Sequence, residues 1–168
     1  MLTFGLDTPI GPLAGSIDNQ TLVSLHFSEQ EPGPACDHPI AAAIAHYFKG
    51  EHDALKTIDA RPKGTEFQLA VWAEVAGIAC GETASYGDIA ERIGRPTAVR
   101  AVGAANGKNP IGLVIPCHRV VGAGGTMTGY AWGLERKRWL LTHEGAGDGQ
   151  QDLFGSLAGD FGPDQVVV

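Results

Sequence analysis

Cys117 and the residues around it are the part of this sequence whose residue types could do chemistry. The cysteine follows the apolar run Ile111–Ile115 and a proline, and it directly precedes His118 and Arg119. A thiol attacks as its thiolate, so it needs a base, and an imidazole serves as that base when a carboxylate orients it. Glu144 offers such a carboxylate further along the chain. A buried, inert cysteine is the alternative that these residues alone leave open.

The other cysteines give no sign of a second reactive centre. The three cysteines cannot all pair within one chain, and none of them forms a C-x-x-C motif. The adjacent Cys117 and His118 are poorly spaced to chelate one metal ion together. We therefore expect free thiols, no metal ion and no cofactor, with Cys36 and Cys80 as bystanders.

Composition and charge restrict the class of protein. Of the 168 residues 43% are hydrophobic, which is enough for a packed core. No apolar run approaches the length of a membrane span and no signal peptide is visible, so we expect a cytoplasmic protein without a membrane partner. The formal charge of -7 divides unevenly: positions 1–64 contribute -4, positions 65–144 contribute +1 and positions 145–168 contribute -4. Only the middle segment could face phosphate without repulsion.

The first 62 residues predict a small α/β domain. Thr3–Leu6, Leu13–Ile17 and Leu22–Phe27 read as strands separated by turn residues, and Pro39–Phe48 reads as a helix with Gly50 just beyond its end. This pattern predicts a small sheet covered by one helix.

Residues 63–145 predict a second, mostly helical domain. Thr65 and Gln68 form a capping box at the start of a buried amphipathic helix. A short helix ending at Gly94 and another with Thr97 as its expected N-cap give the outline of a helix-turn-helix, which is also typical of plain helix packing. Ile111–Ile115 reads as a strand.

A glycine-rich loop and a last helix complete this domain. The loop covers Gly122–Gly129, and the helix covers Leu134–His143 with Gly145 as its C′ residue. The remaining residues, 146–168, read as a flexible acidic tail.

The sequence around Cys117 resembles the O6-alkylguanine-DNA alkyltransferase family, in its bacterial type. The most specific segment is Ile115-Pro116-Cys117-His118-Arg119-Val120-Val121, preceded by Asn109-Pro110-Ile111. Further matches follow in the expected order: Gly64–Gln68, Val71-Trp72, Ser85-Tyr86-Gly87, Arg100–Gly103, Gly129-Tyr130 and His143-Glu144-Gly145. The resemblance covers residues 64–145 strongly. It implies a small, ribonuclease-H-like α/β region followed by a mostly helical, winged helix-turn-helix-like domain.

The resemblance also implies a reaction and the residues that perform it. The reaction is stoichiometric transfer of an alkyl group from O6-alkylguanine in double-stranded DNA to the protein, with O4-alkylthymine left open as a second substrate. Cys117 matches the alkyl acceptor, His118 the base that works through a water, and Glu144 the carboxylate that orients this base. Asn109 matches the residue that braces the active-site turn. Tyr86 matches the tyrosine whose hydroxyl reaches guanine N3.

Residues that bind DNA and the damaged base follow from the same resemblance. Arg100 matches the arginine of the recognition helix that fills the gap in the base stack, and Thr97 and Ala98 start that helix. Residues expected to line the guanine pocket are Val120, Tyr130, Ala131 and Trp132. The carbonyls of Cys117 and Val120 match acceptors for the guanine amino group, and the Ala131 N–H matches the donor to O6. Trp132 stands where many relatives have a small residue, so it should narrow the pocket.

Two other functions stay open. One is a protein that binds alkyl lesions and recruits other repair factors without transfer, although such relatives lack the cysteine. The other is a helix-turn-helix regulator with Cys117 as a sensor, for which no effector domain is visible. In the tail, Gln150, Leu153 and Phe154 resemble the short peptide by which bacterial repair proteins hold the replication sliding clamp. The clamp is therefore a candidate partner.

Overall fold

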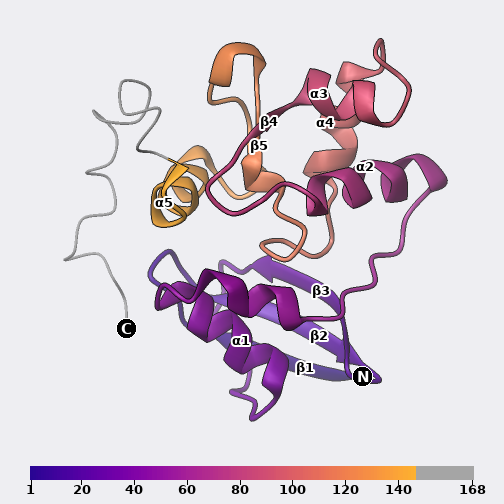
Figure 1. Cartoon of the computed structure of the whole chain (residues 1–168). Coiled ribbons are helices and arrows are strands. Elements are labelled where there is room, and N and C mark those ends of the chain that lie inside the picture. The colour runs from indigo at the N-terminus through magenta and orange to yellow at the C-terminus, as the bar shows by residue number, and fades with distance from the viewer. Residues whose placement is uncertain (147–168) are drawn as a thin grey trace. The chain divides into compact units, whose positions relative to one another are not determined.

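The computed structural model describes residues 1–146, which form two compact units (Figure 1). The first unit contains Met1–Lys63 together with Pro110–Val114. The second contains Gly64–Asn109 and the described residues from Ile115 onward. Within residues 1–146, no helix is long and apolar enough to cross a membrane.

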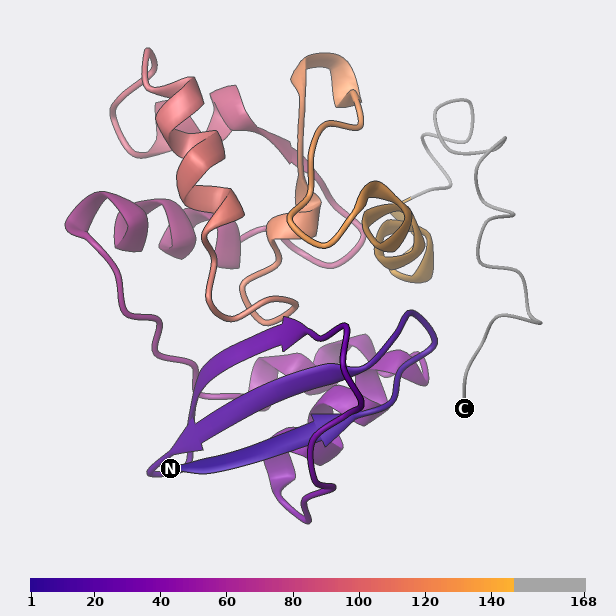
Figure 2. The same cartoon turned by 180° about the vertical axis from the view of Figure 1, so that it is seen from behind.

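The first unit is a three-stranded antiparallel sheet covered by a helix. Strands β1 (Leu2–Leu6), β2 (Leu13–Asp18) and β3 (Thr21–Phe27) pair in this order, which confirms the three predicted strands. The β2–β3 hairpin turns through Asn19 and Gln20, both with positive φ, as two-residue hairpin turns require. Helix α1 (Pro39–Phe48) lies across one face of the sheet (Figure 2) and is followed by the 3-10 helix η1 (His52–Thr57).

The segment after Asn109 differs from the expected strand at Ile111–Ile115. Of these residues only Ile111 forms a bridge, opposite Leu25 of β3; the Leu25 N–H donates to the Pro110 carbonyl and the Gly112 N–H donates to the Leu25 carbonyl, both at 2.9 Å. Leu113 then takes a left-handed conformation with φ of 66°, which interrupts the extended backbone that a strand needs. An apolar run signals burial, and all of Ile111, Leu113 and Ile115 are buried, but burial alone does not require a strand.

The second unit is built from four α-helices. Their bounds are α2 (Glu66–Ala76), α3 (Tyr86–Arg92), α4 (Val99–Gly107) and α5 (Leu134–His143). The predicted capping box is present at α2, where Thr65 and Gln68 exchange hydrogen bonds of 3.0 and 3.2 Å. The expected end of α5 is also confirmed, because Gly145 follows it with φ of 81°. A helical second unit after a small antiparallel sheet is thus the arrangement that the sequence predicts.

The link between α3 and α4 corrects one prediction. Gly94 has φ of 74° and turns the chain after α3. The N-cap of α4 is Ala98 rather than Thr97, and no side chain caps this helix. A Thr next to a helix start predicts a cap only to within a residue or two, because the local turn sets the first helical residue.

Short elements connect these helices and carry the reactive segment. They are β4 (Ala84–Ser85), β5 (Val120–Val121) and the 3-10 helices η2 (Cys117–Arg119) and η3 (Ala123–Gly125). Strands β4 and β5 pair in parallel, with Ala84 opposite Val120 and Ser85 opposite Val121. This pairing places the start of α3 beside the residues that follow β5.

Candidate active site

Cys117 lies in a tight turn that two asparagines hold from the side of α4. It is the first residue of η2 and only 4% of its surface is exposed. The Asn109 amide donates to the Ile115 carbonyl at 2.7 Å, and the Asn106 amide donates to the Cys117 carbonyl at 3.2 Å. The backbone before and at the cysteine is therefore fixed by side chains.

His118 is completely buried and faces Glu144. The His118 Nε2 lies 2.9 Å from Glu144 Oε1, with neither side chain exposed to solvent. Because the carboxylate accepts, Nε2 carries the proton and Nδ1 is left with its lone pair. Within residues 1–146, Nδ1 has no hydrogen-bond partner. The imidazole is thus oriented as a base at Nδ1.

Arg119 completes this network, in a role that the sequence analysis missed. Its Nε and Nη2 donate to the two oxygens of Glu144 at 2.8 and 2.9 Å, and its Nη1 donates to the Ile78 carbonyl at 2.7 Å. Such bidentate pairs combine strong attraction with a fixed geometry. The segment Cys117–Arg119 therefore supplies both partners of Glu144 from adjacent positions.

Burial and charge set the protonation states of this cluster. Burial raises the pKa of the Cys117 thiol, although Asn109, Lys137 and Tyr130 act in the opposite direction. Burial also lowers the pKa of His118, so the imidazole is neutral despite the carboxylate beside it. Burial would raise the pKa of Glu144, but its contacts with His118 and Arg119 outweigh this effect and lower it. With a neutral imidazole, the Arg119 guanidinium is the charge that keeps Glu144 ionised.

Lys137 is a second buried cation that the sequence analysis missed. It comes from α5 and is 0% exposed, and its ammonium donates to the carbonyls of Val120 and Thr128 at 2.7 and 3.0 Å. Burial lowers its pKa to about 8, partly offset by the nearby Cys117. Its spacing from Leu140 and Leu141 was the available signal, because positions three and four apart share one helix face. Lys137 anchors the loop after β5 close to the thiol.

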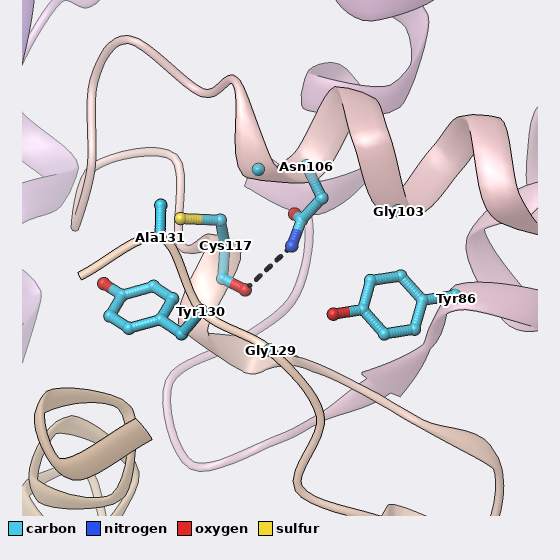
Figure 3. A pocket seen from close by; sticks show the side chains of 8 residues that line it. Tyr86, Gly103, Asn106, Cys117, Gly129, Tyr130 and Ala131 are labelled. Atoms are coloured by element: carbon cyan, nitrogen blue, oxygen red, sulfur yellow. Dashed lines mark hydrogen bonds between the residues drawn. The ribbon is translucent and has the colours of Figure 1, made fainter. Parts of the chain in front are cut away.

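A pocket of about 250 Å³ opens beside Cys117 (Figure 3). The residues that line it are Tyr86, Gly103, Asn106, Gly107, Cys117, Gly129, Tyr130 and Ala131. Tyr86 and Tyr130 stand at opposite ends, and the Tyr86 hydroxyl points into the pocket. This hydroxyl accepts a 3.4 Å hydrogen bond from Thr128. The thiol of Cys117, the phenol of Tyr86 and several glycine backbones therefore line the same pocket.

The structure separates the remaining predicted residues into two groups. Val120 is buried in β5 and Trp132 packs edge-on against Tyr130, with ring centroids 5.4 Å apart; neither lines the pocket. Arg100 and Thr97 are exposed, at the start of α4 and just before it. Ala98 is half-buried as the N-cap of this helix. The exposure of Arg100 and Thr97 leaves these two residues accessible to a large partner.

Comparison with protein families gives a match over the second unit. Residues 66–146 match the model described as 6-O-methylguanine DNA methyltransferase, DNA binding domain. The match includes the Cys117 turn, the helices α2 to α5 and Glu144.

Whole proteins are similar over most of both chains. The chain is 55% identical to the methylated-DNA–protein-cysteine methyltransferase of Methanosarcina mazei, covering 83% of this chain and 94% of that protein. It is 41% identical to the protein of the same name from Shigella flexneri, covering 82% and 92%. Among solved structures, Mycobacterium tuberculosis OGT in complex with DNA superposes with a TM-score of 0.77 at 41% identity, covering 86% and 92%.

Proposed function

The chain belongs to the methylated-DNA–protein-cysteine methyltransferase family, whose members repair DNA directly by alkyl transfer to a cysteine, and we propose that here Cys117 is that cysteine. The observation that carries the proposal is the buried order Cys117–His118–Glu144 beside a pocket of about 250 Å³. The substrate is O6-alkylguanine in double-stranded DNA, with O4-alkylthymine as a second substrate to be tested. DNA is the partner named for the solved relative from Mycobacterium tuberculosis.

The thiol must lose its proton before it can attack. Burial keeps Cys117 protonated at rest, and the neutral His118 has its basic Nδ1 without a protein partner within residues 1–146. In the proposed step, the proton passes from the thiol to Nδ1 through a water, and Glu144 stabilises the imidazolium that forms. The adjacent Lys137 ammonium stabilises the thiolate.

The transfer itself exchanges one bond for another. The Cys117 sulfur forms a bond to the alkyl carbon while the bond from that carbon to guanine O6 breaks, and the electron pair stays on guanine. Tyr86, whose hydroxyl points into the pocket, donates to N3 of the resulting anion. The Ala131 N–H supports the developing charge at O6. The product is a thioether, which water does not readily hydrolyse, so each molecule acts once.

The lesion must leave the helix to reach the pocket, because the target atom is inaccessible in a duplex. We assign α3 and α4 to a helix-turn-helix, with Thr97, Ala98 and Arg100 at the DNA and Arg100 filling the vacated stack. The exposure of Arg100 supports this role. Likeness of the first unit to ribonuclease H, a separate boundary near residue 62 and a cytoplasmic location remain predictions.

Intact-protein mass after mixing with O6-methylguanine DNA tests this function. We expect a gain of one methyl group, located on Cys117 by peptide mapping. Cys117→Ala should show no gain while binding the same duplex almost as well, because phosphate contacts supply sequence-independent affinity. Binding without a mass change in the parent protein would instead support a lesion-binding recruiter. Methyl transfer by Cys117→Ala would disprove the assignment of the nucleophile.

We also propose that the sliding clamp is a partner, through Gln150, Leu153 and Phe154. These residues lie outside the described residues, so the proposal is supported by sequence alone. Leucine and phenylalanine would fill an apolar pocket while glutamine adds a polar contact, and such a tether raises the local concentration of the repair domain. The test is a binding isotherm of purified clamp with a peptide spanning positions 147–157. Equal binding by the peptide with Leu153→Ala and Phe154→Ala would refute it.

A further inference from the structure

Thr128 contacts the Tyr86 phenol from outside the pocket. It lies in the loop after β5, is half-buried and does not line the pocket that Tyr86 and Cys117 share. Its hydroxyl donates to the Tyr86 oxygen at 3.4 Å, which is the only hydrogen bond of that phenol within residues 1–146. Thr128 thus contacts a residue of the proposed reaction without reaching the substrate itself.

Packing on two sides fixes how Thr128 presents this hydroxyl. The Lys137 ammonium, which is completely buried, donates to the backbone carbonyl of Thr128 at 3.0 Å. The Thr128 methyl group lies against Gly122, where an added Cβ atom would come 2.9 Å from the methyl carbon. Threonine is branched at Cβ, so its side chain has few orientations. With the methyl group packed against Gly122, the hydroxyl is the branch that faces Tyr86.

The direction of this hydrogen bond determines where the phenol proton points. A phenol has one proton to donate, and its oxygen can also accept. Because the Tyr86 oxygen accepts from Thr128, its own proton is left for another acceptor, and the hydroxyl points into the pocket (Figure 3). In the proposed transfer that acceptor is N3 of guanine. As the phenol shares its proton with N3, its oxygen becomes more negative, and a donor to this oxygen binds more strongly.

We propose that Thr128 is a positioning residue for alkyl transfer, which aims the Tyr86 phenol at the base and stabilises the charge that its oxygen gains in the transition state. The inference rests on the proposed function and adds a residue to it. A hydrogen bond of 3.4 Å is long in the resting protein. Only the part of an interaction that strengthens between the ground state and the transition state accelerates a reaction, and a donor to a developing negative charge strengthens in this way.

A cycle of protein and base changes tests whether Thr128 acts through Tyr86. Thr128→Val removes the hydroxyl at nearly constant shape, whereas Thr128→Ser keeps it. Both are made in the parent protein, and Thr128→Val is also made in Tyr86→Phe, where no phenol hydroxyl remains to be positioned. The substrates are matched duplexes with O6-methylguanine or its 3-deaza analogue, in which a C–H group replaces N3. The measurement is the single-turnover rate of methyl transfer to Cys117.

Thr126 offers a matched control in the same loop. This residue is exposed, and its hydroxyl donates to the Ala123 carbonyl at 2.8 Å rather than to Tyr86. Thr126→Val therefore makes the same chemical change without touching the phenol. We expect it to change the rates on the two bases by the same factor.

We expect Thr128→Val to slow transfer from O6-methylguanine about fivefold, the value of one hydrogen bond. Thr128→Ser should restore most of this loss, because serine keeps the donor. On the 3-deaza base the valine change should have no effect, because the phenol has no N3 to donate to. In Tyr86→Phe it should likewise add nothing to the loss that the phenylalanine causes.

Equal slowing on both bases, or the same slowing with and without the phenol, would overturn the inference, because Thr128 would then act only on the structure of the loop. An unchanged rate in Thr128→Val would overturn it as well. Thermal unfolding checks that each variant folds, and Thr128→Ala replaces the valine variant if that one does not. Absence of any methyl adduct in the parent would instead refute the proposed function.

Discussion

The two units of the molecule differ in how deeply their ion-paired side chains are buried. In the first unit two ion pairs lie at the surface: the side chains of Lys56 and Asp53 are 75% and 84% exposed, and those of Arg61 and Asp59 are 76% and 58% exposed. In the second unit Glu144 is 0% exposed between His118, which is 0% exposed, and Arg119, which is 10% exposed.

Exposed and buried ion pairs contribute differently to the free energy of unfolding. Exposed pairs contribute little to stability, because water and salt screen them. Buried charges are costly to desolvate and are strongly destabilising when one partner is removed. A fold that places Glu144, Arg119 and Lys137 inside one unit therefore bears a cost that packing does not require. We attribute that cost to the chemistry proposed for Cys117.

Removal of the central carboxylate should give the largest effect. Glu144→Gln leaves the Arg119 guanidinium buried without a counter-ion and replaces one of the two oxygens that accept from His118 and Arg119 by an NH2 donor. We expect the free energy of unfolding to fall by about 3–5 kcal/mol. The single-turnover rate should fall by roughly 10²–10⁴, and the apparent pKa of Cys117 should rise. Chemical denaturation and the transfer rate against pH measure these effects; an unchanged pH profile would remove Glu144 from the proton path.

Acid should lower the free energy of unfolding of the parent protein through Glu144, without any mutation. The pKa of Glu144 is lowered in the folded state, so between its folded pKa and 4.5 the unfolded chain binds more protons. The stability that Glu144 contributes is therefore complete above pH 4.5 and is lost as the pH falls towards its folded pKa. Denaturation between pH 6 and pH 3 should show this loss in the parent. A parallel curve for Glu144→Gln would show that other groups cause it.

Lys137 should change the free energy of unfolding less than Glu144 does, and it should do so at alkaline pH. Its folded pKa of about 8 lies below the ordinary 10.5, so between these values the unfolded chain binds more protons. Stability from this group therefore rises with pH across that window, by up to about 3 kcal/mol. We expect Lys137→Met to lack this rise and to transfer more slowly, because the thiolate loses its neighbouring cation. The same alkaline rise in the variant would show that Lys137 is not its source.

An exposed charge of the second unit should act on DNA rather than on folding. Arg100→Ala is expected to leave unfolding unchanged and to reduce extrusion of the lesion roughly tenfold. Fluorescence of a base analogue next to the lesion reports extrusion, and duplex affinity is measured in parallel. Equal fluorescence with the parent would leave Arg100 as an ordinary surface residue.

The exposed pairs of the first unit should give the smallest effect. Lys56 holds the pKa of Asp53 below its usual value, but the Asp53 side chain is 84% exposed to water. Asp53→Asn should therefore leave the denaturation midpoint and the transfer rate unchanged. A clear shift in the midpoint would mean that the contrast between the two units is weaker than their burial indicates.

Local signals predicted most of the fold. The strands of the first unit, the capping box at Thr65 and the C′ glycine at position 145 all depend on neighbours in sequence, and each was confirmed. The prediction of a strand at Ile111–Ile115 was wrong. Its apolar pattern indicates that the segment is buried, but it does not predict the left-handed backbone conformation of Leu113.

The candidate site was predictable only in part. Cys117, His118 and Glu144 were candidates from their residue types, a resemblance gave them their expected roles, and the structure brings the last two into contact. Arg119 and Lys137 were missed because their partners are distant carboxylate or carbonyl oxygens, which no local pattern names. Asn106 was missed for the same reason, since its contact is with the backbone of Cys117.

The short parallel pair β4–β5 has a consequence for how the protein acquires its reactivity. It joins position 84 to position 120, so the whole intervening segment must be synthesised before the pair can close. Contacts so distant in sequence form slowly, since the loop entropy is lost before they stabilise the chain. During synthesis, Tyr86 emerges long before Cys117 meets its neighbours. A nascent chain therefore carries an ordinary thiol, and the reactive one arises only when folding of the second unit is complete.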